Sequence, residues 1–147
     1  MPRPGFCSGN GIAALGRIFA LERLQMGECV SYCRDAAELD KITAKKIAEC
    51  AKRGEADAAA VYTECGKKLG AGLSVIMDLL NPEVIVIGSV YERSGELLKE
   101  AMYSVIEKEA LPQTRQACRI VPAQLGDSIG DYAALSIAVM ALQKINR

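Results

Sequence analysis

The sequence predicts an α/β fold in which parallel strands form an incomplete sheet flanked by helices. A continuous apolar run, 84–87, is mostly β-branched and does not alternate with polar residues, as in a strand covered on both faces. A second short strand, 118–121, follows a helical segment, so that strand, helix and strand form a right-handed parallel crossover. The chain has 147 residues, of which half are hydrophobic, and this suits a single domain, 1–147.

The amino-terminal part of the chain is predicted to be helical. Ser8 or Asn10 can cap a first helix that ends near Gly27. Its apolar residues recur at helical spacing: Ile12, Leu15, Ile18, Phe19 and Leu24. Residues 28–41 show no clear periodicity, and the sequence leaves their structure open.

Two more helices precede the first strand. Thr43 can cap the shorter one, which Gly54 ends. Residues 55–80 predict one long helix, whose apolar face comprises Ala59, Val61, Tyr62, Cys65, Leu69, Leu73, Ile76 and Leu80. Glycines at 66, 70 and 72 each cost roughly 1 kcal/mol relative to alanine inside a helix. We therefore expect a close neighbour there, either another helix or a nucleotide ring.

The carboxyl-terminal part combines the two strands with two helices. Pro82 cannot continue the long helix and leads into the strand 84–87. Residues 94–111 predict the helix between the strands, and Pro112 ends it. The last helix, 132–144, is apolar almost all round and should be buried on more than one side. Two parallel strands make a poor sheet alone, so we expect them to belong to a larger one.

The composition argues against several classes of function. Lysine plus arginine equals aspartate plus glutamate at 18 each, and tryptophan is absent, so we expect no nucleic-acid partner. Because no apolar stretch could span a bilayer and no signal peptide is visible, we expect a cytoplasmic protein without a membrane partner. The six cysteines should then be reduced thiols. With no histidine in the sequence, we expect no metal site.

The most informative single position is Gly88, at the carboxyl end of the first strand. In open α/β sheets ligands lie just beyond this end, and a residue without a Cβ lets a flat group approach the main chain. A strand-to-helix turn that merely needs a glycine would explain Gly88 equally well.

Three segments together resemble the carboxyl-terminal half of the ROK family, a name for repressors, open reading frames and sugar kinases. They are Leu69-Gly70-Ala71-Gly72 continuing to Asn81-Pro82-Glu83 and Gly88, then Ser94-Gly95-Glu96-Leu97-Leu98, and Leu125-Gly126-Asp127 followed by Gly130-Asp131-Tyr132-Ala133-Ala134-Leu135. The resemblance implies one lobe of an actin-like ATPase (ribonuclease H-like) fold. It also implies ATP in a cleft between two lobes, with a hexose or N-acyl hexosamine as phosphate acceptor.

The same resemblance implies that Gly88, Ser89 and Val90 bind the cofactor, on the adenosine side of an ATP site. The family turn usually reads Gly-Gly, whereas this chain has Ser89 at the second position. If that position needs a positive φ, serine costs stability or nucleotide affinity. We therefore expect ATP binding that is weak or lost.

The chain also departs from the family kinases. It has no Asp-x-Gly-Gly-Thr phosphate loop, no corresponding base and no zinc-binding cysteine segment, and Pro4 stands where the sugar-binding glutamate would fall. Phosphoryl transfer depends on positioning and on neutralising the phosphates. We therefore predict no catalytic residue, no metal ligand and no sugar site in this chain, and no kinase activity from it alone. Mg²⁺ is expected only in a full-length family member.

Three hypotheses remain open. The chain is the adenosine-side lobe of a ROK sugar kinase, the effector-binding or dimerisation part of a ROK transcriptional repressor, or a non-catalytic dimerising module. Each is compatible with a homo-oligomer, which we expect. Asp127 and Asp131 could serve as bases, but acids in a first helical turn are commonplace, and we favour that interpretation.

Overall fold

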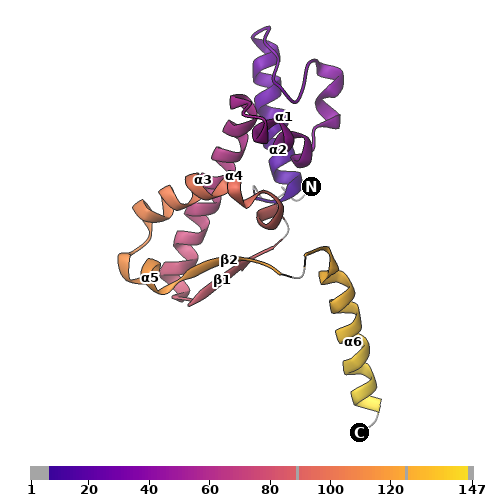
Figure 1. Cartoon of the computed structure of the whole chain (residues 1–147), viewed down its shortest axis with the longest axis vertical. Helices are drawn as coiled ribbons and strands as arrows, with labels where there is room; N and C mark the ends of the chain where they lie inside the picture. The colour runs from indigo at the N-terminus through magenta and orange to yellow at the C-terminus, as the bar shows by residue number, and fades with distance from the viewer. Residues whose placement is uncertain (1–6, 89, 125, 146–147) are drawn as a thin grey trace.

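The computed structural model describes residues 7–88, 90–124 and 126–145. Helices dominate it, and one small sheet lies beneath them (Figure 1). The elements in chain order are α1 (Gly9–Gln25), η1 (Ala36–Lys41), α2 (Ala44–Lys52), α3 (Ala56–Leu80), β1 (Val84–Ile87), α4 (Val90–Glu109), α5 (Pro112–Ala117), β2 (Arg119–Pro122), η2 (Gly126–Ser128) and α6 (Ile129–Ile145). Here η denotes a short 3₁₀ helix.

The helix boundaries follow the predicted signals closely. Ser8 caps α1, where its hydroxyl accepts a hydrogen bond from the Gly11 N–H at 3.0 Å. Thr43 caps α2 in the same way. Gly54 follows α2 with a φ of +90°, and Asn81 ends α3 in the left-handed region just before the proline. Local backbone chemistry therefore sets these ends.

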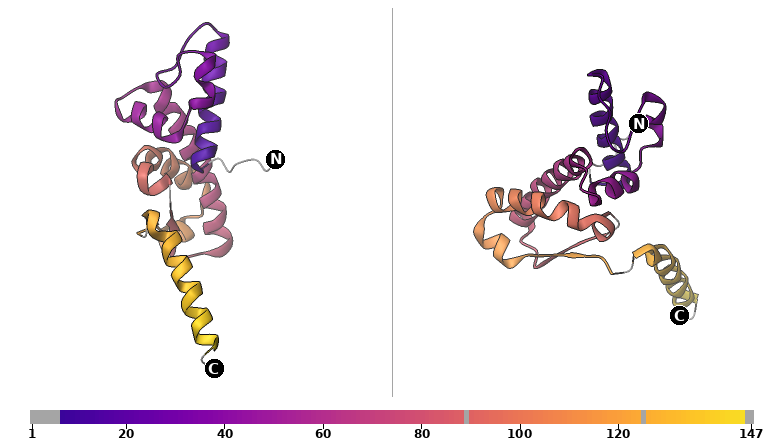
Figure 2. Two further views of the ribbon diagram at one scale, coloured as in Figure 1. Left: turned by 90° about the vertical axis from the view of Figure 1, so that its right-hand side faces the viewer. Right: turned by 45° about the horizontal axis from the view of Figure 1, so that its top comes forward.

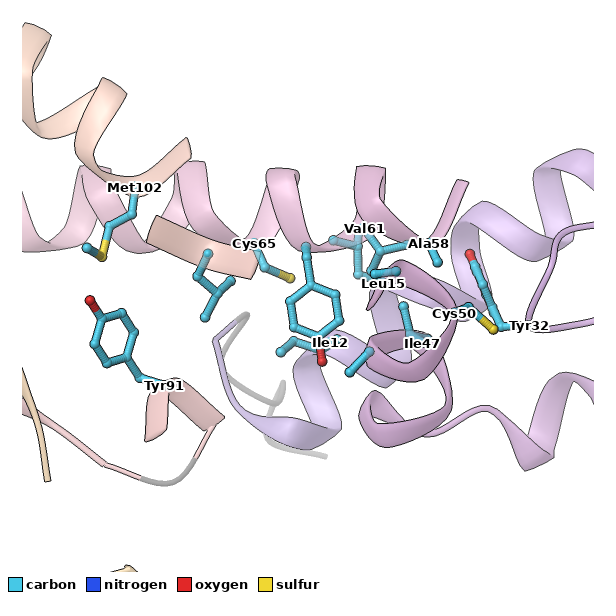
Figure 3. Packing of buried hydrophobic residues seen from close by; sticks show 14 of the residues in the cluster. Ile12, Leu15, Tyr32, Ile47, Cys50, Ala58, Val61, Cys65, Tyr91 and Met102 are labelled. Carbon is cyan, nitrogen blue, oxygen red and sulfur yellow. The ribbon is translucent and has the colours of Figure 1, made fainter. Parts of the chain in front are cut away.

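One apolar core joins α1, α2, α3 and α4 (Figure 3). It contains the fully buried residues Ile12, Tyr32, Ile42, Ile47, Val61, Tyr62, Cys65, Met77, Leu98, Met102 and Ile106. The Tyr32 hydroxyl donates to the Gly16 carbonyl at 3.2 Å, and the Tyr62 hydroxyl donates to the Ala44 carbonyl at 3.0 Å. Because both hydroxyls are bonded, the two rings can be buried at little polar cost.

Two of the three glycines in α3 provide the expected close approach, and the neighbour is a helix. A Cβ at Gly66 would lie 2.7 Å from the Leu98 carbonyl oxygen, and one at Gly70 would collide with the Met102 carbonyl oxygen. The backbone of α4 therefore crosses α3 at these glycines. Gly72 has open space around its Cβ position, so the prediction does not hold there.

The two strands pair in parallel, as the crossover predicted, with Val84 opposite Arg119 and Val86 opposite Val121. The sequence predicted that both faces of the first strand would be covered, and the structure covers only one of them. Ile85 and Ile87 pack against the core, whereas Val84 and Val86 on the opposite face are exposed. Among the described residues the sheet has these two strands only.

Three features of the carboxyl-terminal half differ from prediction, and the structure resolves the segment 28–41 that the sequence left open. The helix between the strands starts at Val90, and Ser94 interrupts it with φ −140° and ψ 19° instead of opening it. Pro112 begins the extra helix α5 rather than only ending its predecessor, because proline fits a first helical turn. The second strand starts and ends one residue later than predicted. Within 28–41, an isolated bridge between Val30 and Cys33 precedes η1.

Two apolar surfaces that were expected inside are exposed. Ile76 and Leu80, assigned to the inner face of α3, lie on its outer face. The last helix, α6, stands away from the rest of the molecule and exposes apolar residues along its length (Figures 1 and 2). None of the described helices is long and apolar enough to cross a membrane.

Candidate nucleotide site

Gly88 lies where β1 ends and α4 begins. Beside it, the Ala123 N–H donates to the Ile87 carbonyl at 2.9 Å, which extends the ladder past the end of β2. The φ of Gly88 is not positive, and among the described residues an added Cβ would meet Ala123 Cβ alone, at an ordinary 3.6 Å. Nothing among the described residues therefore requires glycine at this position. Ser89, the second predicted cofactor residue, lies outside the described residues.

Val90, the third predicted residue, lines a cavity of about 360 Å³. Four helices line this cavity: α2 supplies five of the lining residues, and the others come from the start of α1, from α3 and from the start of α4. The lining residues are Gly9, Ala44, Lys45, Ala48, Glu49, Lys52, Tyr62, Val90, Arg93 and Ser94. Of the three predicted cofactor residues, Val90 lines the cavity, Gly88 is not among the lining residues, and Ser89 lies outside the described residues.

Local structure explains how the walls are placed. The break at Ser94 separates the first turn of α4 from the rest of that helix, so Val90 and Arg93 can face α2. The Tyr62 hydroxyl holds the start of α2 through its bond to the Ala44 carbonyl. Burial raises the pKa of this phenol, and a side-chain hydrogen bond with Ser94 partly opposes the shift. Tyr62 therefore remains a neutral part of the wall at ordinary pH.

The charged side chains of the site favour an anion. Lys45, Lys52 and Arg93 supply three cations around the cavity, and Glu49 supplies one carboxylate. A smaller cavity of about 220 Å³ adjoins it, because Lys52 and Arg93 line both. The larger cavity could hold a flat apolar group at Ala44, Ala48 and Val90 with an anionic group beside its cations, whereas Glu92 and Glu96 line the smaller cavity and disfavour an anion there.

Other candidate residues from the sequence lie elsewhere. Lys68 forms an ion pair with Glu64 at 3.4 Å along α3. Lys67 lines a separate groove between α3 and α4. Asp131 lies in the first turn of α6, and Asp127 belongs to η2. Within the described ranges, no group of three or more cysteine, aspartate or glutamate residues could hold a metal ion.

Sequence reasoning missed the α2 wall and Arg93. Lys45, Glu49 and Lys52 recur at intervals of four and three residues, which marks one face of a helix. That spacing by itself resembles an ordinary solvated face. Only the packing of α2 against the start of α4 turns this face into one wall of a cavity.

The ROK family matches residues 4–141 of the chain. Among curated proteins, the transcriptional dual regulator NagC of Escherichia coli K12 is 30% identical over 104 residues, which cover 69% of this chain and 26% of NagC. A glucokinase of Halalkalibacterium halodurans is 27% identical over 123 residues, or 84% of this chain and 36% of the glucokinase. The chain thus spans between about a quarter and about a third of the length of the curated relatives it matches.

Solved structures agree with this relationship. A ROK glucokinase of Streptomyces griseus, solved with glucose and AMPPNP, superposes with a TM-score of 0.63 at 22% identity. The match covers 82% of this chain and 39% of that glucokinase. The fold is therefore that of the ROK sugar kinases, an actin-like ATPase fold, represented here by a helix-rich part with a two-stranded parallel sheet. The chain belongs to the ROK family.

Proposed function

We propose that this chain is the adenosine-side lobe of a ROK protein and that its cavity binds the base and ribose of ATP. One observation carries the proposal: the cavity of about 360 Å³ begins at Val90, directly beyond the carboxyl end of β1. This is the position at which open α/β sheets bind their ligands. Its volume falls within the range of about 300 to 1,000 Å³ that small-molecule sites occupy.

The chemistry of the walls supports a nucleotide. Ala44, Ala48 and Val90 offer an apolar surface for a purine, and Lys45, Lys52 and Arg93 offer cations for phosphate oxygens. Among the described residues, neither a steric contact nor a positive φ requires glycine at position 88. A ligand lying against the main chain would explain why a glycine is found there.

Catalysis is not part of this proposal. Phosphoryl transfer needs a base and phosphate-neutralising groups, and the sequence lacks the family motifs that would supply them. The chain contributes binding surface, and ATP should bind without being hydrolysed. Mg²⁺ would enter with the nucleotide in a complete family member.

Isothermal titration with ATP tests the proposal. The variant Ala48→Leu adds bulk to the cavity wall and should weaken ATP binding at least tenfold. Ala71→Leu is the matched control, because Ala71 is half-buried on α3 and lines none of the described cavities. It should bind ATP as the unaltered chain does. Absence of ATP binding by the unaltered chain, or equal loss in both variants, would contradict the proposed site.

A second candidate function is the effector-binding part of a ROK regulator. The 30% identity to NagC, a DNA-binding transcriptional regulator, favours it. Titration with N-acetylglucosamine and with glucose separates the two functions. Sugar binding in the absence of ATP binding would favour the regulator, whereas ATP binding without sugar binding would favour the adenosine-side lobe.

A further inference from the structure

A second cavity lies between the linker 28–34 and the ends of three helices. Its volume is about 840 Å³, and it shares no lining residue with the candidate nucleotide site. Three arginines line it, and each comes from a different segment: Arg23 from the last turn of α1, Arg34 from the linker and Arg53 from the C-cap of α2. The start of α3 supplies the remaining wall. We call this cavity the arginine hollow.

Hydrogen bonds hold the linker wall of the arginine hollow in place. Val30 and Cys33 exchange two backbone hydrogen bonds, at 3.1 and 3.0 Å, which close a tight turn. Asp57, in the first turn of α3, accepts hydrogen bonds from both the N–H and the hydroxyl of Ser31 within this turn. The wall is therefore positioned before any ligand binds, which reduces the free energy that a ligand loses in ordering it.

Two of the three acidic side chains at the arginine hollow already have partners. Glu28 Oε2 accepts a hydrogen bond from Arg23 Nη1 at 2.6 Å, so these two opposite charges offset each other. Asp57 accepts a third hydrogen bond, from the Ala58 N–H at 2.9 Å. Glu55 is the third acid, and it is exposed. One carboxylate is thus left to balance the other two arginines.

Arg34 and Arg53 keep most of their hydrogen-bond donors available. The Arg34 side chain takes part in no hydrogen bond or ion pair within the described ranges. Arg53 donates from Nη2 to the Cys50 sulfur at 3.1 Å, and its other guanidinium donors have no partner in the described part of the chain. Each guanidinium has five N–H donors in a planar fork that matches the oxygens of a phosphate. With Glu55 as the remaining acid, the hollow has an excess positive charge.

We propose that the arginine hollow binds a small organic phosphate, whose phosphate group contacts Arg34 and Arg53. A phosphate monoester carries about −1.5 to −2 charges at neutral pH and has three strong acceptor oxygens. Its organic part can lie on Val30, Ala56 and Ala60, which line the same hollow. The volume lies within the range of about 300 to 1,000 Å³ that small-molecule sites occupy, and a phosphate ion alone would not fill it. This site goes beyond the proposed nucleotide site and does not depend on it.

NMR titration of the ¹⁵N-labelled chain with phenyl phosphate tests the proposal. Amide signals of 29–34 and 53–57 should shift and saturate, with a dissociation constant of about 1 mM or tighter. Arg34→Gln should weaken binding about tenfold, because it removes charge-assisted hydrogen bonds. Arg34→Lys keeps the charge without the planar fork, and its affinity should fall between the two. Arg119→Gln, at an exposed arginine of β2 outside the hollow, is the matched control and should bind as the unaltered chain does.

Two further ligands separate the parts of the proposal. Benzoate has the same ring with one negative charge, and inorganic phosphate has the charge without the ring, so both should bind more weakly than phenyl phosphate. Benzoate of equal affinity would contradict recognition of the phosphate group. Inorganic phosphate of equal affinity would mean that the hollow takes an adventitious ion only.

The location of the shifts decides whether the site is correct. Absence of saturable shifts, or shifts confined to the surroundings of Lys45, Lys52 and Arg93, overturns the proposal. So does an equal loss of affinity in Arg34→Gln and Arg119→Gln. Circular dichroism establishes that each variant is folded. Arg34→Gln should bind ATP as the unaltered chain does, so the outcome at the arginine hollow is distinguishable from the outcome at the nucleotide site.

Discussion

The packed helices α1 to α4 differ sharply from the segment formed by β1, β2 and α6. In the first region large side chains such as Tyr62 and Met102 are fully buried, and glycines let two helices cross at backbone contact. In the second, apolar residues of the strands and of α6 are exposed. The helices thus supply most of the core, and the sheet adds Ile85, Ile87 and Ile120 on one face only, whereas the apolar residues of α6 are exposed. Stability should therefore reside mainly in the helical region.

The largest expected effect comes from two methionines that differ only in location. Met77 is 1% exposed in the core, and Met140 is 61% exposed on α6. Met77→Ala should lower the free energy of unfolding by about 2–5 kcal/mol, since it removes a buried side chain and leaves a cavity. Met140→Ala should change the stability of the isolated monomer by less than about 0.5 kcal/mol. Urea denaturation at low protein concentration measures both, and similar losses would contradict the contrast.

Two glycines of α3 provide the next comparison. Gly66→Ala should lower the free energy of unfolding by about 1–3 kcal/mol, because the added methyl group meets the Leu98 carbonyl oxygen. Gly72→Ala should raise it by up to about 1 kcal/mol, because that position is open and alanine favours the helix. Thermal unfolding of the two variants gives the signs. A stabilising Gly66→Ala would mean that α3 and α4 are less closely packed.

Alkaline pH should weaken the helical core. Burial raises the pKa of the Cys65 thiol from 9.0 to about 12. Between these values the unfolded chain loses this proton and the folded chain keeps it, so stability is complete below about pH 9 and falls towards pH 12. The slope from this group is at most about 1.4 kcal/mol per pH unit. Urea denaturation at pH 8, 9.5 and 11 should show a shallower decline for Cys65→Ala, and an identical decline would exclude Cys65 as a cause.

The smallest effect concerns the attachment of α5 to the helical region. Asp78 of α3 accepts hydrogen bonds from the Leu111 N–H at 3.1 Å and from the Thr114 hydroxyl at 2.6 Å. Asp78→Ala should lower the free energy of unfolding by about 1 kcal/mol. Glu83→Ala, at an exposed acid near the same end of α3, should have almost no effect. If both variants lose stability equally, the loss comes from charge rather than from these bonds.

Much of this architecture follows from local sequence. Ser8, Thr43 and Gly54 mark helix ends through bonds and torsion angles that involve only nearby residues, and the structure confirms all three. The parallel pairing of the strands was also predictable. A helix between two strands returns the chain to the same edge of the sheet, so the second strand runs in the same direction as the first.

Features that depend on contacts between distant segments were not predictable in this way. The walls of the cavity come from α2 and from the start of α4, whose sequences separately resemble exposed helix faces. Likewise, apolar periodicity identified a buried face for α3 but not which neighbours were present to cover Ile76 and Leu80. Periodicity indicates which residues can be buried, and tertiary packing decides which of them are.

The interruption of α4 at Ser94 has a mechanical consequence for the site. A continuous helix would transmit any shift of Val90 or Arg93 along its axis to Leu98 and Met102, which contact α3. Because the backbone at residue 94 departs from helical torsion angles, torsion changes at this one residue would let the turn 90–93 rotate while the rest of α4 remains fixed. A guest molecule could thus be accommodated without disturbing the interior.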